Sequence, residues 1–172
     1  MQIRKAVMAD IPQIHRLVNG YAQQGLMLRR PLVMLYEQVR DFAVAVEGDR
    51  VLGCGALHIL WHDLAEIRSL AVQPECRGRG VGRALVDFLV QEALDLGLAR
   101  VFALTYQQEF FARCGFQVVK KETLPQKVWK ECIYCEKFHA CDEIAMIRYL
   151  RPVPEAESEE IPVVEIPLWV RE

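Results

Sequence analysis

The sequence predicts one α/β domain in which a mixed β-sheet carries helices on both faces. Two observations support this class. Three consecutive apolar segments between residues 42 and 72 are too closely spaced for intervening helices, which indicates antiparallel strands. After them, apolar segments alternate with stretches of helical periodicity, which is typical of strand–helix–strand units. The 172 residues, of which 52% are hydrophobic, are enough for one core.

In the N-terminal part, a short strand is expected over Gln2–Val7. Asp10 to Gln13 then form a D-x-x-Q capping box, with Pro12 in the first turn of the helix that follows. Gly25 ends the periodic segment, and Pro31–Val39 is expected to form a second helix opened by proline.

The central part begins with a hairpin whose turn is Gly48–Asp49, followed by a strand over Leu64–Val72. A helix is expected over Val81–Leu96, with Gly97 at its end. Arg100–Thr105 lacks apolar–polar alternation, so it is expected to be a buried strand.

The C-terminal part is expected to contain a helix over Gln108–Phe116 that ends near Gly115, a strand directly after it, a helix from Pro125 and a strand over Glu143–Leu150. The order is β-α-α-β-β-β-α-β-α-β-α-β. Residues 1–150 are expected to form the domain, and residues 151–172 are expected to form an acidic, proline-containing arm that packs on its own domain or on a neighbouring copy.

Charge and hydropathy exclude several classes of function. Lys plus Arg is 21 and Asp plus Glu is 23, a net charge of −2, so no general attraction to nucleic acid or to an anionic membrane is expected. No apolar run reaches the roughly 18 residues of a membrane span, and the N-terminus lacks a signal-peptide core. A soluble cytoplasmic protein is expected.

The stretch "LAVQPECRGRGVGRAL" places glycines and arginines between a strand and a helix. The first amides of a helix have no intrahelical acceptor, and glycine lets a ligand approach them closely. Phosphate oxygens are therefore the expected ligand, with Arg77, Arg79 and Arg83 adding attraction. The spacing is not that of a P-loop, and a dinucleotide loop normally opens the first β-α-β unit.

The pattern V-x-P-x-x-R-G-x-G-x-G resembles the acetyl-CoA pyrophosphate loop of the GNAT N-acetyltransferases, and "FFARCGF" is a second landmark. The resemblance covers roughly Gln2–Leu150 and implies the GNAT fold, with acetyl-CoA as acetyl donor lying between two splayed strands. It implies cofactor contacts from the strand end and the loop: Leu70, Ala71, Val72, Arg77, Gly78, Arg79, Gly80, Val81 and Gly82.

Further stretches, among them "AEIRSLAV" and "VFALTYQQEFFARCGF", resemble the stand-alone acetyltransferase form of the N-acetylglutamate synthases. That resemblance implies acetylation of the α-amine of glutamate, the first step of arginine biosynthesis. Another amine, such as that of glutamine or a peptide N-terminus, stays open, as does a non-catalytic sensor of acetyl-CoA. Pairing into a homodimer is common among GNAT domains.

The resemblance also implies roles for single residues. Glu66 matches the general base, and Thr105 matches a hydroxyl that acts as acid or oxyanion donor. Arg30 matches the arginine that binds the α-carboxylate of the substrate, a task suited to a bidentate guanidinium. Ser69 lies at a substrate position where longer members have Cys.

One position departs from the family pattern. Many GNAT enzymes have at position 111 a Tyr that protonates the leaving thiolate, but Phe111 has no proton to donate there. Phe111 is still expected to contact the cofactor. The nearest phenol in the sequence is that of Tyr106, which precedes the helix.

The segment "KVWKECIYCEKFHACDE" contains Cys132, Cys135 and Cys141, with His139 between them. Three interpretations are open: weak candidates for a zinc site, which the spacing does not favour; cysteines that pack a helix onto the sheet; or a redox switch. Lys137, in the same segment, is the candidate for binding the side-chain carboxylate of the substrate.

Overall fold

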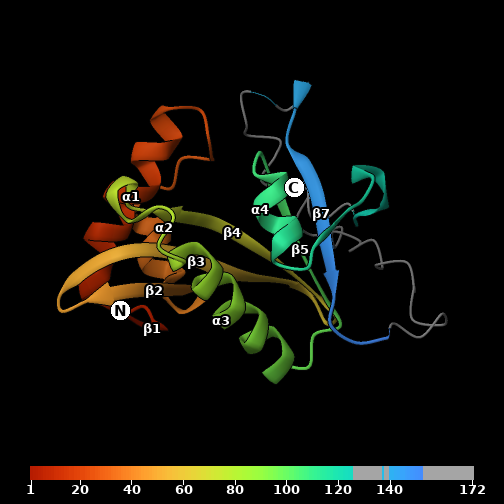
Figure 1. Cartoon of the computed structure of the whole chain (residues 1–172), viewed down its shortest axis with the longest axis horizontal. Helices are drawn as coiled ribbons and strands as arrows, with labels where there is room; N and C mark the ends of the chain where they lie inside the picture. The colour runs from red at the N-terminus through yellow and green to blue at the C-terminus, as the bar shows by residue number, and fades with distance from the viewer. Residues whose placement is uncertain (126–136, 138–139, 153–172) are drawn as a thin grey trace, which may run out of the picture.

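The computed structural model describes residues 1–125, 137 and 140–152. Within these residues, seven strands form one sheet in the order β1-β2-β3-β4-β5-β7-β6 (Figure 1). The strands are β1 (Gln2–Lys5), β2 (Phe42–Glu47), β3 (Arg50–Trp61), β4 (Leu64–Val72), β5 (Arg100–Thr105), β6 (Gln117–Val118) and β7 (Ile144–Tyr149). The α-helices are α1 (Ile11–Gln23), α2 (Leu32–Glu37), α3 (Val81–Asp95) and α4 (Gln108–Arg113).

The predicted mixed sheet is confirmed. Strands β1 to β4 are antiparallel neighbours, β4 and β5 are parallel, and β7 pairs antiparallel with both β5 and β6. Gly48 provides the left-handed turn of the β2–β3 hairpin, with φ 56°. The parallel pair requires a crossover, which α3 supplies.

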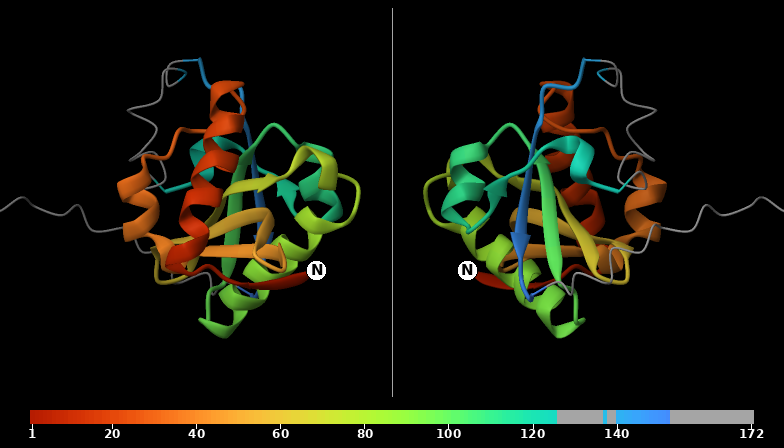
Figure 2. Two further views of the ribbon diagram at one scale, coloured as in Figure 1. Left: turned by 90° about the vertical axis from the view of Figure 1, so that its left-hand side faces the viewer. Right: turned by 90° about the vertical axis from the view of Figure 1, so that its right-hand side faces the viewer.

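Helices cover both faces of the sheet (Figure 2). One apolar cluster joins α1 and α2 to β2 and β3, and it includes Ile14, Leu35 and Val44. A second cluster joins α3 to the opposite face through residues such as Leu85 and Ala103. No helix in the described part of the chain is long and apolar enough to cross a membrane.

The predicted capping box at Asp10 is wrong. Asp10 makes no side-chain bond to the first turn of α1; it accepts the backbone N–H of Val7 at 2.8 Å and a bidentate bond from Arg4 at 2.6 and 3.0 Å. Gln13 instead bonds the hairpin, donating to the carbonyl of Asp49 and accepting from the amide of Val51. The half-buried guanidinium of Arg4 and the amide of Val7, at the start of a short 3₁₀ turn over Met8–Asp10, therefore compete successfully for the carboxylate.

The other boundaries shift by a few residues. The second helix ends at Glu37, short of its predicted end at Val39, and a 3₁₀ turn over Val39–Asp41 follows it. Gly97 ends α3 as predicted, with φ 82°. The expected helix from Pro125 falls mostly in residues outside those described, and the arm does so beyond residue 152.

Candidate active site

Strands β4 and β5 are paired at one end only. Their parallel ladder joins Leu64–Glu66 to Arg100–Phe102. Beyond these residues β4 stays with β3 as far as Val72, while β5 stays with β7 as far as Thr105. The two strands therefore diverge (Figure 1). This is the splayed pair that the resemblance implies. Beyond Glu66 and Phe102 the facing edges of β4 and β5 are not paired with each other, and we call this divergence the opening.

A β-bulge reverses the direction of the side chains halfway along β4. The register with β3 shifts between Cys54 and Ala56, and Ser69 has φ 53°, in the left-handed region that β-strand residues avoid. Before the bulge, Leu64 packs on the face that carries α1 and α2; after it, Leu70 packs in the cluster on the α3 face. Ser69, expected at the substrate, is thus part of the bulge that turns the strand end.

Glu66 lies where the opening begins, because its pairing with Phe102 is the last one between β4 and β5. Its neighbours Ala65 and Ile67 pack against the α3 cluster, so strand alternation points Glu66 to the face that carries α1 and α2. The side chain of Glu66 is only 16% exposed. The predicted base is therefore a largely buried carboxylate at the start of the opening.

Polar residues that sequence reasoning missed surround Glu66. Its Oε2 lies 3.8 Å from Nη1 of Arg68, whose guanidinium also donates to Oε1 of Gln38 at 3.3 Å. His58 is the cross-strand partner of Glu66, and its Nδ1 lies 2.9 Å from Oδ2 of Asp41. The signal that could have found Arg68 is a second charged residue two positions after Glu66 in a mostly apolar strand.

The glycine loop connects β4 to α3 through a 3₁₀ turn over Pro74–Cys76. Gly78 and Gly80 have φ 75° and 79°, and a Cβ on either would have no heavy atom within 4 Å. The two glycines are thus required by backbone conformation, and the space beside them is open. Gly80 caps α3 from the left-handed region, and the first intrahelical bond of that helix runs from Ala84 to its carbonyl. The first amides of α3 adjoin this open space.

Gly82 is needed for a different reason. A Cβ there would lie 3.3 Å from the ring of Phe110 in α4, so Gly82 lets the two helices pack closely. Phe111, expected as a cofactor contact, is 5% exposed and lies in the core, with its ring edge-on to those of Phe110 and Phe116. Of the two adjacent phenylalanines, it is therefore Phe110 that adjoins the start of α3.

Arg77 and Arg79 of the glycine loop, and Arg83 in the first turn of α3, all have protein partners. Arg79 reaches Glu47 at 3.3 Å, and Arg83 pairs with Asp87 at 3.2 Å. Arg77 turns back onto Tyr21, to which it donates at 2.7 Å. The exposed positions of Arg79 and Arg83 still permit long-range attraction of an anion.

Thr105 ends β5 and is 7% exposed. Its Oγ1 accepts the backbone N–H of Gln107 at 2.8 Å, which orders the turn into α4. This bond uses a lone pair and leaves the hydroxyl proton able to donate.

Arg30 is held in the segment between α1 and α2. Its amide donates to Oδ1 of Asn19 at 3.0 Å, and its carbonyl accepts from Nδ2 of Asn19 at 2.9 Å. The residue is 6% exposed, whereas the adjacent Arg29 is exposed. Burial therefore distinguishes two arginines that are adjacent in the sequence.

Lys137, which is distant in the sequence, contacts the segment between α1 and α2. Its Nζ donates to Oη of Tyr106 at 3.1 Å and to the carbonyl of Gly25 at 3.4 Å, and Tyr106 donates to Asp142 at 2.7 Å. Hydrogen bonding to Tyr106 raises the pKa of Lys137 and lowers that of Asp142, while burial raises the pKa of Tyr106 itself. Lys137 thus places a positive charge beside Gly25, near the start of the connection from α1 to α2.

The cysteine cluster is only partly described. Cys132 and Cys135 lie outside the described residues, and Cys141 is half-buried, with its carbonyl accepting from Lys121 at 2.9 Å. Within the described ranges, no three His, Cys, Asp or Glu residues are grouped as metal ligands would be.

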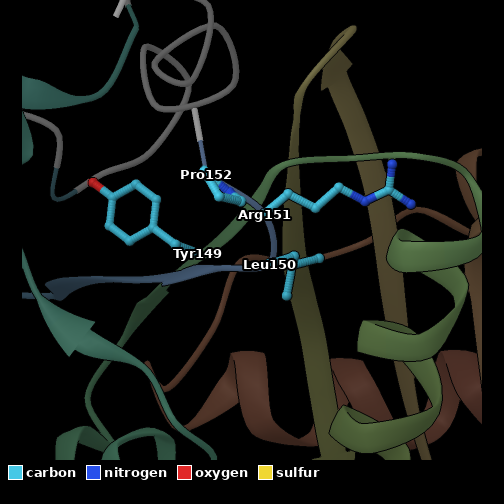
Figure 3. A pocket seen from close by; sticks show the side chains of 4 residues that line it. All are labelled: Tyr149, Leu150, Arg151 and Pro152. Atoms are coloured by element: carbon cyan, nitrogen blue, oxygen red, sulfur yellow. The ribbon is translucent and has the colours of Figure 1, made fainter. Parts of the chain in front are cut away.

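A separate hollow of about 490 Å³ lies at the closed end of the sheet, the end at which β4 and β5 are paired. It is lined by Tyr149, Leu150, Arg151 and Pro152 (Figure 3).

Comparisons with known proteins agree with this geometry. The profile of the acetyltransferase (GNAT) family matches residues 12–116. An uncharacterized N-acetyltransferase of Chlorobaculum tepidum is 44% identical over 86% of this chain and 96% of its own length. An amino-acid acetyltransferase of Mycobacterium tuberculosis is also 44% identical, over 87% of each chain.

Solved structures give the same result. A Mycobacterium tuberculosis protein in complex with CoA matches with a TM-score of 0.77 and 40% identity, over 87% of this chain and 99% of its own. N-acetylglutamate synthase from Neisseria gonorrhoeae, complexed with coenzyme A and N-acetyl-glutamate, matches with a TM-score of 0.79 and 29% identity. The match covers 88% of this chain but 35% of that longer one. The chain therefore belongs to the GNAT family and is an acetyl-CoA-dependent N-acetyltransferase.

Proposed function

We propose that the chain acetylates the α-amine of glutamate and so acts as an N-acetylglutamate synthase, at the first step of arginine biosynthesis. The observation that carries the proposal is the burial of Arg30. The backbone of Arg30 is hydrogen-bonded to Asn19 of α1, on the face of the sheet toward which Glu66 points. A buried guanidinium there is suited to a substrate carboxylate, which needs a partner when it leaves water. The names of the amino-acid acetyltransferase relatives support the same substrate class.

The residues of the opening fit acetyl-CoA. The left-handed Gly78 and Gly80 leave open space beside the first amides of α3, where a pyrophosphate needs donors. The backbone from Leu70 to Val72 lies beyond the bulge at the edge of the opening, where the extended pantetheine would run. We assign the pyrophosphate to the amides of residues 77–82 and the thioester to the strand end.

In this assignment, acetyl-CoA supplies the thioester carbonyl that the amine attacks. Glu66 accepts the proton of the substrate ammonium, directly or through water, because only the neutral amine is a nucleophile. We assign the amides of Leu70 and Val72 as donors to the carbonyl oxygen as negative charge develops on it. The carbon–sulfur bond then breaks, and the nitrogen of the new amide releases its surplus proton to solvent. The thiolate takes a proton from solvent or from Thr105, whose hydroxyl solvent reprotonates. Lys137 pairs with the side-chain carboxylate of glutamate.

The test measures the release of free thiol from acetyl-CoA with glutamate, with glutamine and with a peptide that has a free N-terminus. The proposal expects the highest kcat/KM with glutamate, by about tenfold over glutamine, since a charge-assisted bond contributes roughly 1.5–3 kcal/mol. A higher kcat/KM with glutamine or the peptide would contradict the glutamate assignment and would leave the acetyltransferase activity intact.

A further inference from the structure

Tyr21 joins the end of β4 to the beginning of the glycine loop. Its hydroxyl donates to the carbonyl oxygen of Val72 at 2.6 Å and accepts from Nε and Nη2 of Arg77 at 3.2 and 2.7 Å. The Arg77 guanidinium carbon lies 5.3 Å from the centre of the Tyr21 ring. Tyr21 itself is 9% exposed in the last turns of α1.

The hydrogen bonds of this hydroxyl are mutually consistent. A guanidinium only donates, so both bonds from Arg77 must end on lone pairs of the phenolic oxygen. The single hydroxyl proton is then directed to the carbonyl of Val72, which can only accept. Replacing the hydroxyl by hydrogen removes all three bonds together and leaves the ring in place.

Together, these hydrogen bonds tie the two ends of the segment from Val72 to Arg77 to each other. Gln73 follows Val72 and is fixed by a bond of 2.8 Å from its amide to the carbonyl of Leu52. The 3₁₀ turn over Pro74–Cys76 follows, and Arg77 then returns through Tyr21 to Val72. Both ends of the turn are therefore tied to one buried oxygen, immediately before the left-handed Gly78.

We propose that Tyr21 is a positioning residue for acetyl-CoA and acts through Arg77. By holding the side chain of Arg77, it fixes where the loop leaves the strand, and so where the backbone amides that follow face the pyrophosphate. The guanidinium of Arg77 is then a structural partner of Tyr21 and not a phosphate ligand. This inference rests on the proposed role of the glycine loop, and it is independent of the identity of the acceptor amine.

Helix α1 also contacts the segment that we assign to the acceptor amine, as well as the glycine loop that we assign to acetyl-CoA. Asn19, two residues before Tyr21 in α1, binds both backbone groups of Arg30. The last turns of α1 thus hold the glycine loop through Tyr21 and the backbone of Arg30 through Asn19.

The experiment measures acetyl-CoA affinity by calorimetry, with no acceptor present, at low and high salt. It compares Tyr21→Phe, Arg77→Met and the double variant with the unmodified protein. Tyr149→Phe, a change at an exposed tyrosine near the closed end of the sheet, is the matched control. Gly80→Ala tests the loop assignment separately, and melting temperatures record whether each variant is folded.

We expect Tyr21→Phe and Arg77→Met each to raise the Kd of acetyl-CoA by about five- to tenfold, about the range of one or two lost hydrogen bonds. The double variant should be no weaker than either single variant, because both remove the same connection. The salt dependence of the Kd should stay that of the unmodified protein.

Three results would overturn the inference: a Kd for Tyr21→Phe within about twofold of normal, additive effects in the double variant, or a shallower salt dependence in Arg77→Met, which would indicate direct pairing with phosphate. Arg77 is exposed, so Arg77→Met decides the question even if Tyr21→Phe fails to fold. Normal affinity in Gly80→Ala would instead reject the loop assignment itself.

Discussion

The side-chain amide of Asn19 binds both backbone groups of Arg30: its Oδ1 accepts from the N–H at 3.0 Å, and its Nδ2 donates to the carbonyl at 2.9 Å. An amide side chain used in this way replaces a strand partner and orders a segment that has no ladder of its own. It fixes the main chain from which Arg30 enters the interior, while Arg29 remains in solvent. The proposed substrate contact therefore depends on a residue of α1 that has no chemical role itself.

For the acceptor, Arg30→Ala should raise the glutamate KM at least about tenfold, since a lost charge-assisted bond costs roughly 1.5–3 kcal/mol. The acetyl-CoA KM should stay within about a factor of two, which steady-state kinetics would show. Arg29→Ala is the matched control and should leave both values nearly unchanged. Equal effects of the two variants would remove the main physical support for a carboxylate-bearing acceptor.

For the base, Glu66→Gln keeps the shape of the side chain and removes its ability to accept a proton. Turnover should fall by roughly 10²–10⁴-fold, the usual contribution of general base catalysis. The loss should shrink at high pH, where more of the substrate amine is already neutral, and the affinity for acetyl-CoA should hardly change. A pH–rate profile measures this; unchanged turnover near neutral pH would show that Glu66 is not the base.

For the loop, Gly80→Ala and Gly97→Ala form a matched pair. Both glycines have left-handed φ angles, 79° and 82°, so both alanine variants should lose a similar stability of about 1 kcal/mol. Only Gly80 adjoins the start of α3, whereas Gly97 follows its far end. Calorimetry should therefore find weakened acetyl-CoA binding in Gly80→Ala alone; the same affinity in both variants would contradict the pyrophosphate assignment.

For acceptor selectivity, Lys137→Ala should weaken glutamate more than glutamine, because the amide of glutamine has no charge to pair. In the structure Lys137 donates to Tyr106 and to the carbonyl of Gly25, so some loss with both acceptors is also expected. The ratio of the two kcat/KM values isolates the charge effect, and an unchanged ratio would restrict Lys137 to holding the α1–α2 connection.

For stability, burial raises the pKa of Asp10, but the hydrogen bond from Arg4 and the amide of Val7 outweigh it, so the net pKa lies below 3.8. A depressed carboxyl pKa stabilises the fold above the unfolded-state value and loses this effect as pH falls through the folded-state value. Asp10→Asn should therefore reduce the free energy of unfolding by about 1–3 kcal/mol near neutral pH.

Urea unfolding at several pH values should show this difference shrinking below about pH 4. Asp95→Asn, at an exposed residue on α3, is the control and should have little effect. A difference for Asp10→Asn that does not depend on pH would contradict the ionic explanation.

Much of the fold could be predicted because its signals are local. The Gly48 turn, the helical periodicity from Val81 and the Gly97 cap each depend on residues a few positions apart. The capping box failed because Arg4, from another element, competes for Asp10. A local pattern cannot weigh a partner that only folding brings near.

By itself, the sequence determined the order of the described strands and helices and the glycine loop, since each depends on contiguous residues. The resemblance to a known family, also carried by the sequence, made Glu66 and Arg30 candidates. The tertiary structure alone decided which groups meet: Tyr21 with Val72 and Arg77, and Arg68 with Glu66. It also decided that Phe111 is core and that Arg30 is buried while Arg29 is not. Burial and hydrogen bonds between distant segments depend on how the elements pack, and neither periodicity nor motif spacing encodes that packing.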